Sequence, residues 1–518
     1  MNPQILIIGA GPTGLALAYS LARQGVPFRI IDKNAGTGTA SRALAVHARI
    51  LEQYEQLGLA ERNIKRGHPI LSLDISDGKR VRATVKFHDL GKGLSPFPFI
   101  LSLPQDEHEE ILVDELSKIG VEVEWNTALL SFEDTGEGVN AVLQQEGQPQ
   151  EKAEFAYLCG CDGASSMVRK GLGLEFPGGT YKQLFFVADI ETEKPVDDME
   201  KMDMYMDNDG FMLYMNVRNA NTKRILGIVP EEFNERTDVQ YSEVTNYIEN
   251  KIRVSAAKVN WFSTYRVHNR VSERFAKGRI FILGDAGHLH SPTGGQGMNT
   301  GIGDAINLGW KLAAVVQGKA APKILNTYEQ ERIAFARRLI ATTDKAFQTI
   351  VNQKLPGTLL REYAVPYVLP SVFKFSFPSK NVFKILSQIH INYRNSLLSK
   401  GKAGKVYGGM RLPWIETDIG DNFAPLRSVD WQIHIYGKAQ PELIDFARSQ
   451  SLQLHEFPWE VQMKDAGFKQ DALYLIRPDG HVGLATEKQW VRVLKMYLET
   501  YGIVAFGVDC GRNSKDFT

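Results

Sequence analysis

A glycine-rich turn near the start of the chain, GAGPTG at residues 9–14, has the residue types and spacing that bind phosphate groups. Gly9 permits a tight turn, Gly11 lets the backbone approach a pyrophosphate, and Gly14 lets a helix pack closely on a strand. The helix predicted over 15–23 offers unpaired N–H groups at its N-terminus, which favour phosphate. The residues expected to bind a dinucleotide here are Gly9, Gly11, Pro12, Thr13 and Gly14.

The elements on either side of this turn complete a nucleotide-binding unit. The apolar run Ile5–Ile8 predicts a buried parallel strand before the turn, and Phe28–Ile31 predicts a second strand after the helix. Asp32 ends the second strand about 20 residues past the glycines, where a carboxylate can accept hydrogen bonds from an adenosine ribose. Lys33 follows directly, and we include Asp32 and Lys33 among the expected cofactor-binding residues.

The composition is that of a soluble enzyme. The chain has 518 residues, 43% of them hydrophobic, which is enough for two or three domains. Its 60 basic and 60 acidic residues cancel, so no global field favours nucleic acid or an anionic membrane. The apolar stretch over 5–21 lacks a preceding basic region and is interrupted by glycines and a proline, unlike a signal peptide or membrane anchor. We expect a cytoplasmic protein with no nucleic-acid or membrane partner.

Two further segments repeat the order of apolar strand, carboxylate and loop. The run 155–158 leads into Asp162 within CDGASSMVR, and the run 279–283 leads into Asp285 within GDAGHLHSPTGGQGMNTGIGDA. A nicotinamide-binding Rossmann domain needs only the first turn, whereas this chain returns to the same kind of site twice more. The recurrence favours a larger dinucleotide.

Together the three segments resemble the fingerprints of the FAD-dependent aromatic hydroxylases, the single-component flavoprotein monooxygenases that include phenol hydroxylase and the polyketide and antibiotic hydroxylases. The resemblance covers nearly the whole chain. It implies an α/β fold with a Rossmann-like FAD-binding domain, an inserted β-sheet substrate domain and a C-terminal thioredoxin-like domain. Further matching segments are Ser41-Arg42-Ala43, residues 47–52, Leu103-Pro104-Gln105 and Trp310-Lys311-Leu312.

The resemblance also implies contacts for individual residues. Asp32 would bind the adenosine ribose, and Asp285 would hold a ribityl hydroxyl. Arg42 and Gln105 would contact the phosphate or ribityl region of FAD. Asp162 would brace the site, although in this family its motif is associated with both FAD and NADPH.

The glycine-rich segment after Asp285 leads into a helix predicted over 298–316. Two-electron reduction of a flavin leaves negative charge on the pyrimidine edge of its ring. A glycine-rich helix start supplies fixed N–H donors and the positive end of a helix dipole for that charge. The expected contact residues are Pro292, Gly295, Gly297, Met298 and Asn299, with the last two as donors.

The sequence gives no sign of a metal site or of a disulfide framework. His288 and His290 form an H-x-H pair, but no third ligand lies near them in sequence. Cys159, Cys161 and Cys510 include no C-x-x-C pair, which fits a reducing compartment. We therefore expect no metal and only non-covalent FAD as the bound cofactor.

The implied activity is that of a monooxygenase that consumes NADPH or NADH and O2. It would hydroxylate a small aromatic or phenolic substrate, which includes polycyclic and antibiotic compounds. The hydroxylating species would be a flavin hydroperoxide. The cofactor carries the hard step, and the protein supplies a dry, oriented pocket. Two alternatives stay open: a Baeyer–Villiger oxygenase on the same scaffold, and a non-oxygenating flavin dehydrogenase or flavin-binding module. Either a monomer or a homodimer is compatible with the sequence.

The chain is expected to divide into four parts. The first is a discontinuous FAD-binding domain over 1–175 and 272–345, although part of 70–100 belongs to the substrate domain. The second is a substrate-binding sheet domain over 176–271. A helical connector over 346–400 and a thioredoxin-like domain over 401–518 follow. The last part contains a single cysteine, Cys510, so dithiol exchange is not expected there.

Substrate contacts are expected from the sheet between the second and third fingerprints. Runs over 202–206 and 211–217 predict a β-hairpin in that sheet. No motif assigns a catalytic residue within it. Tyr205, Tyr214 and His268 are candidate bases or orienting groups.

Overall fold

The computed structural model describes residues 4–38, 43–77, 80–193, 198–207, 210–236, 238–291, 294–351, 379–417 and 420–504. The chain folds into two compact units. The first comprises Met1–Ile306 with Arg332–His390, and the second comprises Asn307–Glu331 with Ile391–Thr518. The first unit includes the predicted substrate-binding sheet over 176–271. In the described part of the chain, no helix is long and apolar enough to cross a membrane.

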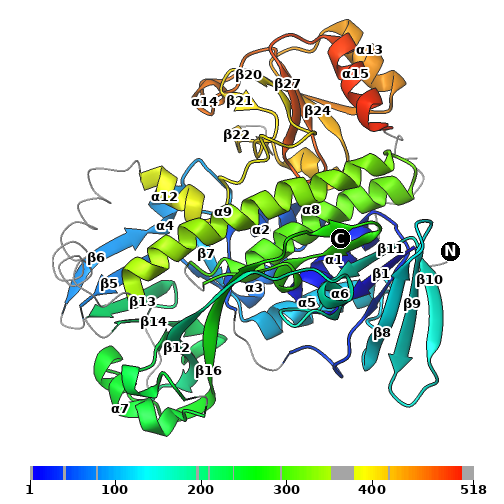
Figure 1. Cartoon of the computed structure of the whole chain (residues 1–518). Helices are drawn as coiled ribbons and strands as arrows, with labels where there is room; N and C mark the ends of the chain where they lie inside the picture. The colour runs from blue at the N-terminus through cyan, green and yellow to red at the C-terminus, as the bar shows by residue number, and fades with distance from the viewer. Residues whose placement is uncertain are drawn as a thin grey trace. The chain divides into compact units, whose positions relative to one another are not determined.

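A five-stranded sheet in the order β17-β18-β11-β1-β2 forms the core of the first unit, and Figure 1 labels its members β1 and β11. Its parallel members are β1 (Ile5–Ile8), β2 (Phe28–Ile31), β11 (Tyr157–Gly160) and β18 (Ile280–Ile282), and the antiparallel edge is β17 (Ala276–Lys277). The apolar side chains of β1 are buried, as expected for a strand covered on both faces. Parallel strands end at one edge, so the three fingerprint segments begin at that edge.

Two helices that carry candidate residues pack against each other beside this sheet. They are α1 (Pro12–Arg23) and α5 (Gln105–Lys118). Proline at the first position of α1 supplies the φ angle that a helix start requires, and the following apolar face is buried. The neighbouring helices are α2 (Ala48–Leu57), α3 (Ala60–Arg66), α4 (Phe87–Gly91) and α6 (Met167–Gly171).

Two small sheets flank the core. One has the order β3-β7-β4, and the other has the order β10-β9-β8. Their bounds are β3 (Ala45–Val46), β7 (Ile100–Ser102), β4 (His68–Ile70), β8 (Thr127–Asp134), β9 (Val139–Gln145) and β10 (Glu151–Phe155).

An eight-stranded sheet contains the predicted hairpin and runs in the order β19-β16-β12-β15-β14-β13-β5-β6. The hairpin is confirmed as β13 (Lys201–Asp207) paired antiparallel with β14 (Gly210–Val217). Helix α7 (Tyr241–Ile252) packs on one face through Val244 and Ile248. The other members are β5 (Ser72–Ser76), β6 (Val81–Lys86), β12 (Gly178–Glu191), β15 (Asn219–Ile228), β16 (Lys258–Val271) and β19 (His288–Leu289).

The helix predicted over 298–316 is observed, and a second long helix follows it. They are α8 (Gly297–Val316) and α9 (Asn326–Val351), which run side by side in Figure 1. Of the expected helical connector, the structure describes the end of α9 and α12 (Ser379–Leu386). Residues 352–378 of that connector lie outside the described residues.

The second unit contains a six-stranded sheet in the order β21-β20-β27-β26-β24-β25. Parallel β24 and β25 connect through a helix, and antiparallel β26 and β27 precede the last helix, which is the thioredoxin-like arrangement. Its elements are β20 (Lys400–Ala403), β21 (Val406–Tyr407), β24 (Gln432–Tyr436), α13 (Pro441–Ser449), β25 (Gln453–Phe457), α14 (Val461–Asp465), β26 (Leu473–Ile476), β27 (Val482–Thr486) and α15 (Val491–Tyr501).

Candidate functional site

The first glycine turn is tight at two of its glycines and open at the third. Gly9 has φ +101°, and a Cβ atom there would lie 2.5 Å from the carbonyl oxygen of Cys161. A Cβ atom on Gly14 would overlap the carbonyl oxygen of Gly9. A Cβ atom on Gly11 would meet nothing within 4 Å. Gly9 and Gly14 are therefore required by packing, whereas Gly11 faces the space that a pyrophosphate needs beside the start of α1.

The second and third fingerprints both pack against the first glycine turn, and the third does so at Thr13. A Cβ atom on Gly284, in the third fingerprint, would lie 2.6 Å from Thr13 Oγ1, and one on Gly301 would overlap the same oxygen. In the second fingerprint, Cys161 packs against Gly9 and Gly14: a Cβ atom on Gly9 would lie 2.5 Å from its carbonyl oxygen, and one on Gly14 would lie 3.3 Å from its Cβ. Segments nearly 300 residues apart in numbering, Gly9 to Gly301, thus pack into one site. Sequence reasoning did not single out Gly301, which the glycine spacing inside α8 could have indicated.

Asp32 is held at the mouth of the turn by backbone donors. Its Oδ2 accepts a hydrogen bond from Ala10 N at 2.7 Å, and its Oδ1 accepts one from Asn34 N at 2.8 Å. The Asp32 side chain is partly exposed, and the adjacent Lys33 is exposed. The carboxylate is therefore oriented and accessible, as ribose binding requires.

Glu109, which sequence reasoning missed, joins Gln105 to the segment after Asp32. Gln105 Nε2 donates to Glu109 Oε1 at 2.9 Å, and Gly38 N donates to Glu109 Oε2 at 2.9 Å. Burial raises the pKa of Glu109 above its usual range. The expected contact residue Arg42 lies outside the described residues.

Asp162 bonds to the start of α6, and Arg169 bonds to the third fingerprint. Asp162 accepts hydrogen bonds from Ser166 Oγ at 2.6 Å and from the backbone N–H groups of Met167 and Val168 at 2.6 and 3.1 Å, so it caps α6. Arg169 donates to the carbonyl of Ala286 at 2.7 Å, which ties the second fingerprint to the third. These contacts match a bracing role.

Asp285 lies in a single 3₁₀ turn, Gly284–Ala286, and its side chain is exposed. Asp304, a buried residue of α8 that sequence reasoning also missed, stabilises the turn through hydrogen bonds. Asp304 Oδ2 accepts from Gly284 N at 3.0 Å and from His288 Nε2 at 2.7 Å. His288 is thus engaged with a carboxylate, and the described residues contain no group of three or more side chains suited to a metal.

The side chains of His47 and Asn299 hydrogen-bond to the glycine loop before α8. Asn299 Nδ2 donates to the carbonyls of Ala45 at 2.8 Å and Gly295 at 2.9 Å, while Asn299 Oδ1 accepts from His47 N at 2.8 Å. His47 Nε2 donates to the carbonyl of Gly294 at 2.8 Å, and burial lowers the pKa of His47 to about 4. The side chains of His47 and Asn299 therefore shape the loop.

The start of α8 at Gly297 leaves its first backbone N–H groups, those of Met298 and Asn299 included, without partners inside the helix. Gly295 has φ +63°, and a Cβ atom there would lie 2.8 Å from the Cβ of Ala45, so the turn requires glycine. Pro292 lies outside the described residues.

The candidate bases Tyr205, Tyr214 and His268 do not lie on the face of the eight-stranded sheet that packs toward β3. Met206 marks that face. Tyr205 and Tyr214 pack into the hydrophobic cluster under α7, and burial raises the pKa of both hydroxyls. Met206 instead packs into a cluster that includes Ala45 of β3. His268 Nδ1 bonds to Thr180 Oγ1 at 2.8 Å along the β12–β16 ribbon. The structure therefore does not bring these three residues together with the fingerprint loops.

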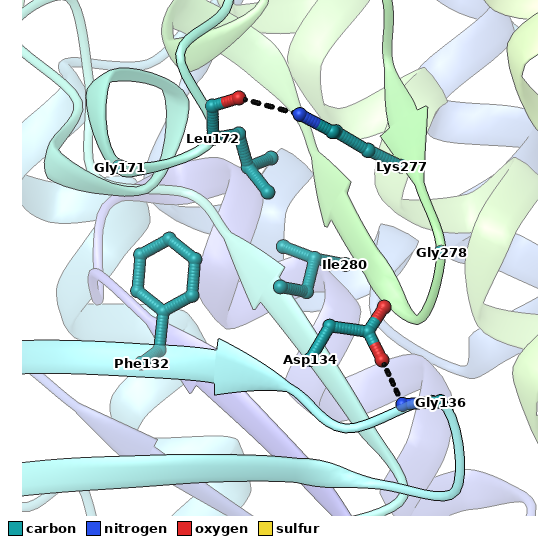
Figure 2. A pocket seen from close by; sticks show the side chains of 8 residues that line it. All are labelled: Phe132, Asp134, Gly136, Gly171, Leu172, Lys277, Gly278 and Ile280. Carbon is teal, nitrogen blue, oxygen red and sulfur yellow. Dashed lines mark hydrogen bonds between the residues drawn. The ribbon is translucent and has the colours of Figure 1, made fainter.

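Figure 2 shows a separate open pocket near the start of β18, whereas the third fingerprint follows the end of that strand. Its polar groups are bonded within the protein: Gly136 N donates to Asp134 Oδ1 at 2.9 Å, and Lys277 Nζ donates to the carbonyl of Leu172 at 2.9 Å. We assign no ligand to this pocket.

The fold and the glycine loops define a dinucleotide-binding flavoprotein, and comparison with known proteins supports this class. A family model described as FAD binding domain matches residues 2–343. The chain is 30% identical to the 6-methylpretetramide 4-monooxygenase of Streptomyces rimosus over 100% of this chain and 98% of that protein. It is 30% identical to the pentachlorophenol 4-monooxygenase of Sphingobium chlorophenolicum over 67% of this chain and 65% of that protein.

A solved structure leads to the same class. OxyS anhydrotetracycline hydroxylase from Streptomyces rimosus matches with a TM-score of 0.76 and 25% identity, covering 98% of this chain and 99% of that chain. The chain belongs to the FAD-dependent aromatic hydroxylase family.

Proposed function

We propose that this chain is a monooxygenase that uses NADPH or NADH and O2 to hydroxylate a phenolic or polycyclic aromatic substrate. The observation that carries the proposal is the convergence of the second and third fingerprints on the first glycine turn, together with open space at Gly11. Both relatives described above are named for the oxygenation of phenolic or polyketide compounds. FAD, when bound, supplies the acceptor for hydride and the activation of O2.

The protein's own residues would bind and orient the cofactor. Gly11 and the start of α1 would receive the pyrophosphate, Asp32 the ribose, and Asp285 a ribityl hydroxyl. The first N–H groups of α8 would stabilise negative charge on the ring. No side chain in the described residues is assigned a proton-transfer role.

The sheet would supply an apolar wall that excludes water from the reacting atoms. Met202 and Met206 of β13 pack with Ile75 and Ala45, on a cluster that joins the sheet to β3. Thioether side chains adapt to irregular aromatic ligands, which fits a substrate larger than a simple phenol. Exclusion of water favours oxygen transfer over loss of the reactive oxygen to solvent.

The test is a screen of phenols and tetracyclic polyketides with purified protein, NADPH or NADH, and ¹⁸O₂. The protein should be yellow and should release free FAD on denaturation, and one substrate class should gain a single ¹⁸O atom with matching NAD(P)H consumption. Reduction and re-oxidation with no ¹⁸O in any organic product would favour the dehydrogenase alternative. Incorporation of ¹⁸O into a lactone or ester would favour the Baeyer–Villiger alternative. Protein that cannot be reconstituted with FAD would overturn the proposal.

A further inference from the structure

One buried carboxylate bonds to three different segments around the cofactor site. Asp304, fully buried in α8, accepts from Gly284 N at 3.0 Å and His288 Nε2 at 2.7 Å through Oδ2, and from Arg332 Nε at 2.5 Å through Oδ1. Gly284 and His288 lie on either side of Asp285. Asp304 therefore fixes both ends of the turn that presents the Asp285 carboxylate.

The same cluster also holds the first turns of α8. Arg332 Nη2 donates to the carbonyl of Thr300 at 3.0 Å. A Cβ atom on Gly303 would lie 3.2 Å from Arg332 Nη2, so the guanidinium lies close against the helix. Asp304 is about two helical turns after Gly297, where the ring-facing N–H groups begin. One charge cluster thus holds the Gly284 turn and the first turns of α8, which also pack together where a Cβ atom on Gly301 would lie 3.2 Å from the Cα of Gly284.

Asp304 and Arg332 form a buried ion pair. Burial alone would raise the pKa of Asp304, but the Arg332 guanidinium and His288 hold it below its usual range. The ion pair with Arg332 is almost completely buried on both sides, with side chains 1% and 2% exposed. Removal of either charged partner would leave the other as an uncompensated buried charge.

We propose that Asp304 is a positioning residue of the FAD site, which sets the Asp285 turn and the start of α8 in register with each other. The proposal rests on the proposed function, because it takes FAD as the ligand. Asp304 does not itself contact the cofactor in this account. It acts through Gly284, His288 and the first turns of α8.

The experiment compares Asp304→Asn with Asp479→Asn in the full-length chain. Asp479 is a matched control because it is equally buried and also pairs with an arginine, Arg477, but lies in the second unit. Both variants should lose stability. Titration of the FAD-free proteins with FAD should show affinity weaker by about tenfold for Asp304→Asn, the size expected when one charge-assisted hydrogen bond is lost, and unchanged for Asp479→Asn.

The midpoint potential of bound FAD gives a second readout, which a purely structural role would not produce. Asp304→Asn leaves the Arg332 charge unbalanced and should raise the potential, because positive charge stabilises the reduced, anionic ring. Arg332→Met leaves the Asp304 charge unbalanced and should lower it. If these variants do not fold, His288→Leu should weaken FAD binding, and His288→Gln, which keeps a donor for Asp304, should restore it.

FAD affinity of Asp304→Asn within twofold of wild type would overturn the inference, as would an equal loss in Asp479→Asn. Potentials that shift in the same direction in Asp304→Asn and Arg332→Met would also overturn it. Failure of the wild-type chain to bind FAD would overturn the proposed function as well as this inference. Normal wild-type binding with unaffected variants would overturn the inference alone.

Discussion

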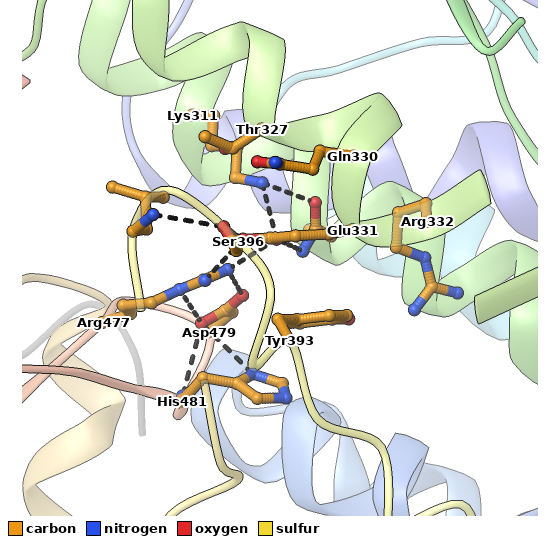
Figure 3. A network of polar contacts seen from close by, with 12 residues as sticks. Lys311, Thr327, Gln330, Glu331, Arg332, Tyr393, Ser396, Arg477, Asp479 and His481 are labelled. Atoms are coloured by element: carbon orange, nitrogen blue, oxygen red, sulfur yellow. Dashed lines mark hydrogen bonds and ion pairs between the residues drawn. The ribbon is translucent and has the colours of Figure 1, made fainter. Parts of the chain in front are cut away.

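Glu331 and Arg332 are consecutive residues of α9, and their side chains complete two different buried ion clusters. Arg332 pairs with Asp304 beside the fingerprint loops, whereas Glu331 Oε2 accepts from Lys311 Nζ at 2.8 Å. The Glu331 carboxylate also accepts hydrogen bonds from both terminal nitrogens of Arg477, at 2.7 and 3.0 Å (Figure 3). Burial lowers the pKa of Lys311 to about 8 despite its carboxylate partner. One helical turn of α9 therefore contributes a side chain to each of two separate buried ion clusters.

The Glu331 cluster should dominate the stability of the second unit. Arg477→Met would take the shared guanidinium away from two buried carboxylates, Glu331 and Asp479, and should cost roughly 3–5 kcal/mol of unfolding free energy. Urea denaturation would measure this loss. Lys495→Ala, which removes an exposed pair with Glu499, is the control and should leave the midpoint unchanged. Equal midpoints for both variants would contradict the anchoring role.

Gly11 and Gly14 should respond differently to the same added methyl group. Gly14→Ala places a Cβ atom on the carbonyl oxygen of Gly9 and should lower the melting temperature of the FAD-free protein. Gly11→Ala has open space around it and should leave that temperature unchanged while weakening FAD binding, because the methyl group occupies the approach of the pyrophosphate. Thermal unfolding and FAD titration separate the two effects. Unchanged FAD affinity in Gly11→Ala would argue against a pyrophosphate there.

Asp285 and Asp162 offer a similar contrast between carboxylates. Asp285→Ala should reduce the FAD retained after gel filtration more than Asp162→Ala does, because only Asp285 is assigned to the ribityl chain. Asp162→Ala removes three hydrogen bonds at the start of α6 and should lower the melting temperature instead. Equal FAD content in both variants and wild type would remove the assignment of Asp285.

Acid should destabilise the protein through two neutral buried histidines. Burial lowers the pKa of His47 and of His108 to about 4, below the value of about 6.5 in an unfolded chain. The unfolded state then binds more protons, so stability is complete above about pH 6.5 and falls as the pH drops toward 4. His108→Gln should reduce the proton uptake on unfolding by about one, measured as the slope of unfolding free energy against pH. An unchanged slope would show that His108 is protonated in the folded protein.

Substrate should control the reductive half of the cycle. In the proposed function the first glycine turn is assigned to FAD, so NAD(P)H would bind transiently, and hydride transfer would need an open site while oxygen transfer would need a closed one. A true substrate should therefore raise the rate of flavin reduction by NAD(P)H in stopped-flow experiments without oxygen. Equal rates with and without every hydroxylated compound would refute this control and leave the oxygenase proposal intact.

Local pattern was sufficient to predict the core elements of the first unit. The runs Ile5–Ile8 and Phe28–Ile31 are β1 and β2 as predicted, because each is a short apolar run bounded by turn residues. The strand predicted over 155–158 is observed as Tyr157–Gly160, since Phe155 ends the preceding strand β10. An apolar run alone does not show where one strand ends and the next begins.

Features that depend on partners distant in sequence could not be predicted in this way. Asp304 and Arg332 are 28 residues apart, and Glu331 and Arg477 are 146 apart. The periodicity of the sequence does not indicate which distant residue a buried charged side chain pairs with. Alternation along β13 likewise predicts two faces for the hairpin, but only packing shows that Tyr205 lies toward α7.

The two cysteines among the described residues, Cys159 and Cys161, are both free and buried beside the first glycine turn. Burial raises the pKa of both thiols, so neither forms the thiolate that peroxide attacks. A flavoprotein that reduces O2 releases some hydrogen peroxide whenever substrate is missing. These two buried thiols are therefore protected from that oxidant, which should limit oxidative self-damage during unproductive turnover.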